Sequence, residues 1–145
     1  MGNPAEIFEL AISVLPADID NMNHVNNVTY VRWVQDVAVA HWRHGATPAE
    51  QERWLWVVIR HEIDYKAPAL LGDEIVAKTW VGHARGLKFE RHTAIFRASD
   101  GALLAKALSL WCSLDAQTKR PTLVTGEIRS RFSVPENESG NLHSR

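Results

Sequence analysis

Residues 18–42 read DIDNMNHVNNVTYVRWVQDVAVAHW, and this stretch decides the fold. A polar loop leads directly into a segment that is apolar on nearly every face. The first ten residues of the stretch carry two carboxylates, one imidazole and four amides. So many hydrogen-bonding groups at the entrance to a buried helix indicate a place for chemistry.

The apolar segment predicts a long helix that begins at Asn26 or Asn27 and ends at Gly45. A short amide side chain caps a helix because its oxygen accepts from the free N–H groups of the first turn, and glycine is a frequent stop. Two adjacent apolar stripes at helical spacing indicate a helix that is covered on most sides. The stripes are Val28, Val31, Val34 and Ala38, and beside them Tyr30, Trp33, Val37 and His41.

The rest of the chain predicts an antiparallel sheet, because the apolar period changes to two and the connections are short. The expected strands cover residues 7–15, 54–65, 74–81, 87–98 and 102–114, with turns at 82–86 and 99–101. A short helix is expected to begin after Thr47, a capping residue followed by Pro48 and Glu50. Residues 121–132 are ambiguous, with a short helix on the sheet edge as one option. One helix wrapped by a curved antiparallel sheet makes an α+β domain.

Composition narrows the function classes. The chain of 145 residues suits one domain over residues 1–134, followed by a polar, disordered tail over 135–145. The net charge of -1 gives no electrostatic reason to bind nucleic acid or an anionic membrane. Neither an apolar run of about 18 residues nor a signal-peptide pattern is present. The single cysteine, Cys112, lies in an apolar run and is expected to be buried, which fits a cytoplasmic location.

The motifs together indicate a family. The residues that carry the signal are Asp18, Asp20, His24-Val25-Asn26-Asn27, Tyr30 and Trp33, then Tyr65, Pro68 and Gly72-Asp73. On these residues the chain resembles the hotdog-fold acyl-CoA thioesterases of the 4-hydroxybenzoyl-CoA thioesterase type. It also looks like the related acyl-carrier-protein thioesterases of plants and bacteria. The resemblance extends from Ile7 to Val134.

The resemblance implies a five-stranded antiparallel sheet wrapped around a helix that begins near Asn27. It implies a homodimer or a homotetramer, usually with two sheets joined edge to edge and active sites at the subunit interface. The substrate would be an acyl thioester of coenzyme A or of a carrier protein, and the reaction would be hydrolysis. No cofactor and no metal ion would be needed.

Asp20 matches the catalytic aspartate of the family, which acts on the thioester as a nucleophile or as a base for water. Without the resemblance, Asp20 is more simply an aspartate of the turn before the helix. His24 either polarises the thioester carbonyl or orients the water, or it is a loop histidine whose polar atoms are satisfied by backbone groups. The backbone N–H of Asn27 is the expected oxyanion donor, because it lies at the positive end of the helix dipole.

Three loop and helix residues are expected to support the site. Asn23 occupies a position that is often glycine in the hydroxybenzoyl type, where a positive φ is wanted and asparagine tolerates it. Met22 departs from the family, because plant-type relatives carry an asparagine two residues after the aspartate. Tyr30 is expected to pack beneath the site with its hydroxyl bonded, and Asp18 to brace the loop.

Charged residues outside the loop give weaker signals. Glu62 is expected to share a face with Trp56 and Val58, and it roughly matches a glutamate that some plant-type enzymes use near the site. A surface glutamate is the simpler interpretation. Arg85, Lys88 and Arg91 are expected to cluster at a hairpin, where they could meet the phosphates of coenzyme A. Exposed strand charges are the simpler interpretation there as well.

Two alternatives to hydrolysis are weighed. A hotdog dehydratase or hydratase would carry a Pro-Gly-His-Phe-Pro loop or an Asp-x-Asn-Pro-x-x-His pattern, and neither occurs here. A non-catalytic module that binds acyl groups stays open. His41 and His44 lie one turn apart without an evident third ligand, so we interpret them as cations near the helix C-terminus rather than as a metal site.

Overall fold

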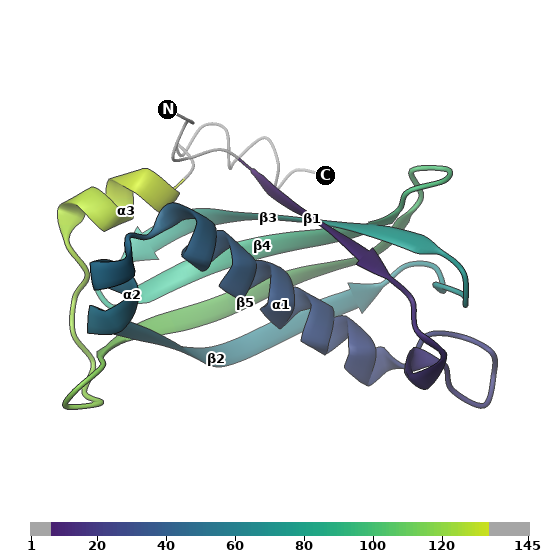
Figure 1. Cartoon of the computed structure of the whole chain (residues 1–145), viewed down its shortest axis with the longest axis horizontal. Helices are drawn as coiled ribbons and strands as arrows, with labels where there is room; N and C mark the ends of the chain where they lie inside the picture. The colour runs from purple at the N-terminus through teal and green to yellow at the C-terminus, as the bar shows by residue number, and fades with distance from the viewer. Residues whose placement is uncertain (1–6, 134–145) are drawn as a thin grey trace.

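The computed structural model describes residues 7–133 (Figure 1). The strands are β1 (Phe8–Ser13), β2 (Trp54–Tyr65), β3 (Glu74–Arg85), β4 (Lys88–Arg97) and β5 (Leu103–Asp115). The helices are α1 (Asn27–Gly45), α2 (Pro48–Arg53) and α3 (Gly126–Phe132), and a 3-10 turn, η1, covers Pro16–Asp18. The tail that the sequence predicts to be disordered lies outside the described residues.

The five strands form one antiparallel sheet in the order β1-β3-β4-β5-β2, and α1 runs across its inner face (Figure 1). This is the α+β arrangement expected from the sequence. None of the helices within residues 7–133 is both long and apolar enough to cross a membrane.

Local sequence fixes both ends of α1. The side chain of Asn26 accepts a hydrogen bond from the N–H of Val28 at 3.0 Å, as the capping prediction required. At the other end, a Cβ on Gly45 would lie 2.6 Å from the ring of Phe132. α1 ends at Gly45, as predicted, and the missing side chain there lets α3 approach the helix closely. Within α1, Trp33, Val34 and Val37 are at most 1% exposed and anchor the helix on the sheet.

The apolar covering of α1 is narrower than the two stripes predicted. Val34 and Ala38 are buried, but Val28 at the start of the same stripe is 72% exposed. Val39 on another side is 40% exposed. Within one chain the sheet therefore covers one side of the helix and leaves apolar residues open beside it.

β3 is longer than the sequence predicts. The expected turn at residues 82–86 is instead a β-bulge between Val81 and Ala84, after which β3 continues to Arg85. The chain reverses at Gly86, which has a φ of 56°. The ambiguous segment contains α3, which is capped by Thr125 and packs on the sheet through Ile128.

A bulge also interrupts β2. The pairing with β5 shifts between Val58 and Arg60, so Ile59 is an extra residue in the strand. Before the bulge, Trp56 and Val58 face α1; after it, the inward positions are His61 and Ile63. The prediction that Glu62 shares a face with Trp56 is therefore wrong, because the extra residue turns Glu62 to the outer face of the sheet.

Candidate active site

The polar loop before α1 is held by a buried carboxylate. Asp18 is 2% exposed, and its Oδ2 accepts from the N–H of Leu15 at 2.9 Å. Its Oδ1 accepts from the guanidinium of Arg32 at 2.9 Å. The backbone N–H of Asn26 also donates to the carbonyl oxygen of Asp18 at 2.7 Å. Asp18 thus braces the loop against the helix, as expected.

Asp20 lies in the turn that this brace supports. Its Oδ1 accepts from the N–H groups of Met22 and His24, at 2.8 and 3.2 Å, and its own N–H donates to the His24 carbonyl oxygen at 2.8 Å. Asn23 closes the turn with a φ of 63°, the conformation that its position was expected to need. Within residues 7–133 the second oxygen, Oδ2, makes no hydrogen bond. Asp20 is half-buried, so one carboxylate oxygen holds the loop and the other stays available.

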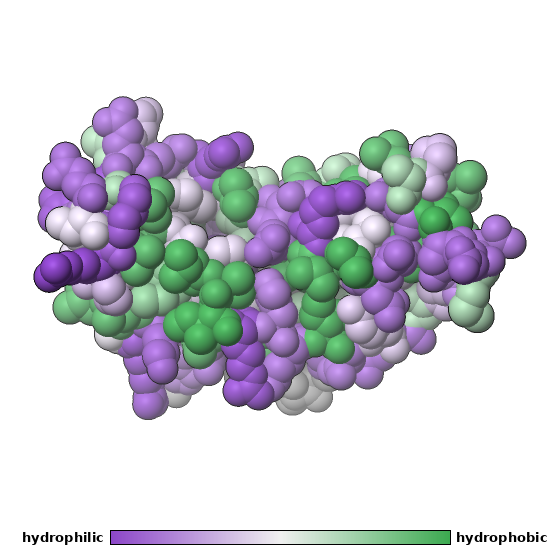
Figure 2. Space-filling view, turned by 90° about the horizontal axis from the view of Figure 1, so that it is seen from below, coloured by the Kyte–Doolittle hydropathy of each residue, from purple (hydrophilic) through white to green (hydrophobic). Residues whose placement is uncertain are grey.

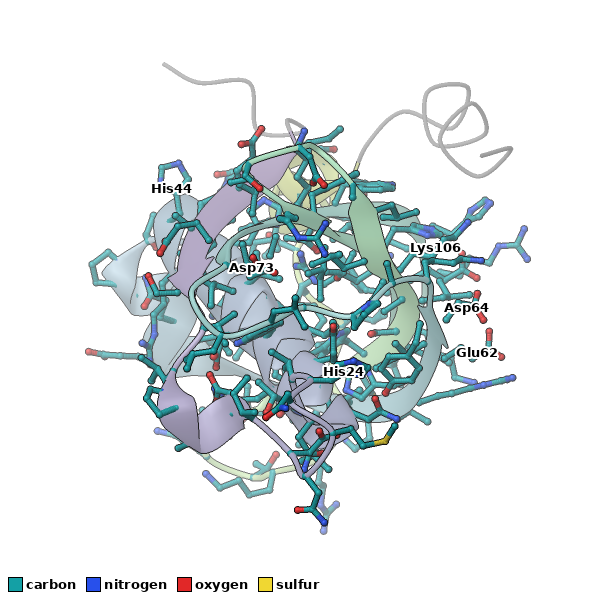
Figure 3. All side chains as sticks on the ribbon, turned by 90° about the vertical axis from the view of Figure 1, so that its right-hand side faces the viewer. His24, His44, Glu62, Asp64, Asp73 and Lys106 are labelled. Carbon is teal, nitrogen blue, oxygen red and sulfur yellow. The ribbon has the colours of Figure 1, made fainter. Side chains whose placement is uncertain are left out.

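The helix N-terminus supplies a donor beside this turn. Asn26 uses its side chain on Val28, and no acceptor for the N–H of Asn27 is present in the described part of the chain. This N–H points out of the positive end of the helix dipole. The half-buried ring of His24 also makes no hydrogen bond within residues 7–133. In Figure 3, which looks onto the N-terminal end of α1, His24 lies near the centre.

Tyr30 supports the site from beneath. It is 3% exposed, its hydroxyl accepts from the N–H of Ala69 at 3.0 Å, and burial raises its pKa. Its ring packs edge-on against Trp33 and Tyr65, with centroids 5.2 and 5.4 Å apart. Tyr65 in turn donates to the carbonyl oxygen of Asn27 at 3.4 Å. The end of β2 is thereby tied to the start of α1.

Three of the predicted substrate-binding residues lie far from Asp20 in the structure. Glu62 is on the outer face of the sheet with Asp64 and Lys106, away from His24 (Figure 3). Arg85 and Lys88 pair across the β3–β4 turn and are exposed. That turn is 11 residues along β3 from Glu74, the partner of Ser13 just before the loop, or about 36 Å. A single chain does not bring them to Asp20.

A cavity of about 290 Å³ lies between the C-terminal half of α1, α2 and the sheet. Six of its 13 lining residues are aromatic. The lining residues used below are Val39, Trp54, Leu55, Trp56, Arg91 and Trp111. In the same chain the cavity begins beside Ala38, 11 residues along α1 from Asn27, or about 17 Å.

Arg91 is not part of an exposed cluster with Arg85 and Lys88, and that prediction is wrong. It is 8% exposed, and its Nη1 donates to Nδ1 of His41 at 2.9 Å and to the hydroxyl of Thr79 at 3.1 Å. Burial lowers the pKa of Arg91 to about 10, so the guanidinium remains charged near neutral pH. The alternation of β4 carried the signal, because Arg91 is in phase with buried Phe89 and Thr93.

His41 also differs from its predicted role as a cation near the helix C-terminus. It is 3% exposed and stacks on Phe8 with ring centroids 5.2 Å apart. Burial, with the nearby charges of Arg91 and His44, lowers its pKa to about 3. His41 is therefore neutral, and its Nδ1 is the acceptor that Arg91 uses. No group of three or more potential metal ligands is present within residues 7–133.

Known proteins share this fold and parts of this sequence. A long-chain acyl-CoA thioesterase of Escherichia coli, FadM, is 25% identical over 127 residues, which cover 83% of this chain and 93% of that protein. A chloroplastic palmitoyl-acyl carrier protein thioesterase of Cuphea hookeriana is 26% identical over 112 residues. These are 77% of this chain but only 27% of the plant protein, so the chain spans about a quarter of that relative.

A solved structure confirms the hotdog fold. It is a 1,4-dihydroxy-2-naphthoyl-CoA thioesterase from Synechocystis, which superposes with a TM-score of 0.74 at 17% identity over 87% of this chain and 95% of that one. The sequence model of the thioesterase-like superfamily matches residues 14–132. With its fold, its family match and its named relatives in agreement, the chain belongs to the thioesterase-like superfamily and is a thioester hydrolase.

Proposed function

We propose that the protein hydrolyses acyl-CoA thioesters, with Asp20 as the reacting carboxylate and the Asn27 N–H as the oxyanion donor. The observation that supports this most is the free Oδ2 of Asp20 in a braced turn that leads directly to an unpaired N–H at the start of α1. In the hydrolysis of a thioester, a carboxylate can serve as the nucleophile or the base, and a helix N-terminus can stabilise the oxyanion.

The two groups act on different atoms. Asp20 either attacks the thioester carbonyl carbon or removes a proton from a water that attacks it. Negative charge then develops on the carbonyl oxygen, where the N–H of Asn27 stabilises it; one such donor contributes about 3 kcal/mol. The thiolate of coenzyme A leaves as the carbonyl reforms. In the base route this step gives the free acid, and the proton held by Asp20 passes to the thiolate. In the nucleophilic route it gives a mixed anhydride on Asp20, which a water then hydrolyses to the acid and the free carboxylate. His24, adjacent to Asp20 through the turn, polarises the carbonyl or orients the water.

A homodimer through β2 belongs to this proposal. Within the described chain β2 pairs only with β5, so its other edge has free N–H and C=O groups along 12 residues. Leu55, Val57 and Ile59 on this strand are 37%, 41% and 53% exposed. Figure 2, seen from the β2 side, shows groups of apolar side chains between polar ones. A long edge strand whose first half exposes apolar side chains favours pairing with a second strand.

Antiparallel pairing of two β2 strands about Ile59 would combine two distant features. It sets the Trp54 end of one strand beside the Tyr65 end of the other. Trp54 lines the aromatic cavity, and Tyr65 is bonded to Asn27 at the catalytic end of α1. The cavity of one subunit would thus receive the acyl group whose thioester reacts at Asp20 of the other. Arg85 and Lys88 lie at the Trp54 end, where they would meet coenzyme A phosphates.

Coenzyme A is preferred to a carrier protein as the acyl carrier. The FadM relative, an acyl-CoA thioesterase, aligns over 93% of its length, whereas the plant carrier-protein enzyme aligns over 27%. Most of the length of the plant enzyme therefore has no counterpart in this chain.

Replacing Asp20 by Asn tests the proposal. An asparagine keeps an oxygen for the N–H groups of Met22 and His24, so the loop should survive and only the charge is lost. We expect kcat to fall about a hundredfold or more, as for loss of a general base or nucleophile. The measurement is thiol release from a panel of acyl-CoA substrates.

The matched control is Asp64→Asn, a carboxylate on the outer face of β2. It should keep wild-type turnover and the same melting temperature as Asp20→Asn. Wild-type turnover in Asp20→Asn on the best substrate would rule out the catalytic assignment.

A further inference from the structure

The aromatic cavity contains a charge that the fold does not need. Arg91 is buried on β4, and within residues 7–133 its hydrogen bonds go to a neutral imidazole and a hydroxyl, both through Nη1. No carboxylate in this part of the chain lies within ion-pair distance of it. Buried charges in proteins are normally paired, because an unpaired one loses its hydration without compensation.

The cavity surrounds this charge with aromatic rings. Trp54, Trp56 and Trp111 all line it. A guanidinium is a hydrogen-bond donor only. The cavity therefore presents a positively charged donor on an apolar, aromatic wall. Its complement is an apolar body that carries an anionic acceptor.

The charge of Arg91 lies at the inner end of the cavity, away from its mouth. Val39 and Leu55, which are 40% and 37% exposed, mark the mouth beside the β2 edge. Arg91 lies on β4, two strands inward from β2, which corresponds to about 10 Å at the usual strand spacing. A volume of about 290 Å³ is roughly twice that of a cavity that holds benzene. A chain entering from the mouth would thus meet Arg91 with its far end.

We propose that this cavity selects acyl groups that end in a carboxylate, and that Arg91 is the residue that binds it. The inference rests on the proposed function, since it takes the cavity as the acyl site of an acyl-CoA hydrolase. The preferred substrates are then mono-CoA thioesters of dicarboxylic acids. The terminal carboxylate accepts from the free N–H groups of Arg91 and pairs with its charge.

Paired substrates of equal length provide the first test. Thiol release is measured with octanoyl-CoA and octanedioyl-CoA, and with decanoyl-CoA and decanedioyl-CoA. We expect kcat/KM to be about tenfold higher or more for the carboxylate-ended member of the better pair, as a charge-assisted bond in a buried site gives. Equal values, or a preference for the methyl-ended member of both pairs, would overturn the inference and leave hydrolysis itself intact.

Variants of Arg91 then assign the preference to this residue. Arg91→Met should remove the preference, so that the ratio of kcat/KM between the carboxylate-ended and methyl-ended members falls to about one or below, while Arg91→Lys, which retains a charge, should keep part of it. Arg120→Met, at an exposed turn, is the control and should keep the wild-type ratio. An unchanged ratio in Arg91→Met would also overturn the inference. If that variant does not fold, Arg91→Lys and the wild-type pairs still decide.

Direct binding separates this inference from the proposed function. Tryptophan fluorescence of the wild-type protein is titrated with decanoate and with 1-decanol, which differ only at the polar end. Tighter binding of decanoate, lost in Arg91→Met, supports the cavity as a carboxylate site even if no acyl-CoA is hydrolysed. Equal binding of both probes, or carboxylate binding that Arg91→Met retains, means that the cavity holds an apolar chain or water only and contradicts the inference.

Discussion

His41 and Arg91 form a hydrogen-bonded pair of two basic side chains beneath α1. The pair is possible because only Arg91 is charged: burial and its neighbours hold the pKa of His41 at about 3, while that of Arg91 stays near 10. His41 is thus an acceptor that positions the guanidinium. At the scale of single residues, its neutrality has a consequence for stability.

The pair predicts a pH dependence of unfolding. In the folded chain His41 stays neutral down to a pH of about 3, whereas in the unfolded chain it binds a proton near its ordinary pKa of about 6.5. Between these values the unfolded state binds more protons, so the free energy of unfolding falls as the pH falls. The contribution of this residue approaches about 1.4 kcal/mol per pH unit.

Urea denaturation of His41→Gln across this range measures the contribution. Glutamine offers Arg91 an acceptor but cannot be protonated, so its pH dependence should be shallower than that of the wild type. His44→Gln, an exposed neighbour on the same helix, should retain the wild-type slope. Parallel curves for wild type and His41→Gln would contradict the assignment of a buried, neutral imidazole.

At the scale of elements, the contact between α1 and α3 depends on the last residue of α1. A Cβ on Gly45 would lie 2.6 Å from the ring of Phe132, which is 4% exposed and cannot swing into solvent. Gly45→Ala should therefore lower the melting temperature, with an overpacking cost of about 1–3 kcal/mol that exceeds the gain in helix propensity.

A second glycine provides the control for this substitution. Nothing lies within 4 Å of a Cβ built on Gly126, the first residue of α3, so Gly126→Ala should leave stability unchanged or raise it slightly. Thermal denaturation of both variants compares the two sites. A neutral Gly45→Ala would mean that Phe132 and α3 shift without cost.

The same elements show what the sequence could predict. Asn26 and Gly45 are local signals whose physics acts within one turn of the helix, and they place α1 correctly. Gly82 and His83 suggested a turn, but they lie in a bulge that only the pairing of β3 with β4 creates. Elements whose ends depend on a partner strand are therefore the ones that the sequence alone misplaced.

The loop residues of the candidate site were predictable for the same reason. Asp18, Asp20 and Asn23 interact with neighbours a few residues away, and the structure places them in one braced turn. Arg91 was misplaced because buried charges are rare and burial is a property of the whole sheet. The cavity that it lines joins four strands and α1, which no local pattern reveals.

At the scale of the whole molecule, the β2 edge predicts assembly. A lysine on an edge strand opposes strand pairing. Ile59→Lys should therefore convert the proposed dimer to a monomer of 16.3 kDa in light-scattering measurements, and it should reduce thiol release because the proposed site draws on both subunits. Leu123→Lys, an equally exposed apolar position outside β2, is the control. A wild-type protein that is monomeric, or an Ile59→Lys variant that remains a dimer, would contradict pairing through β2.

Ile59 also has a consequence for comparing this chain with its relatives. The extra residue shifts the alternation of inward and outward side chains in β2, so the pattern before the bulge is out of phase with the pattern after it. A relative without that residue would align in one half of the strand and be out of phase in the other. Gaps at this position therefore carry structural meaning. An alignment that closes the gap elsewhere would exchange Glu62 with its inward neighbour His61, and would assign an outer carboxylate to the interior.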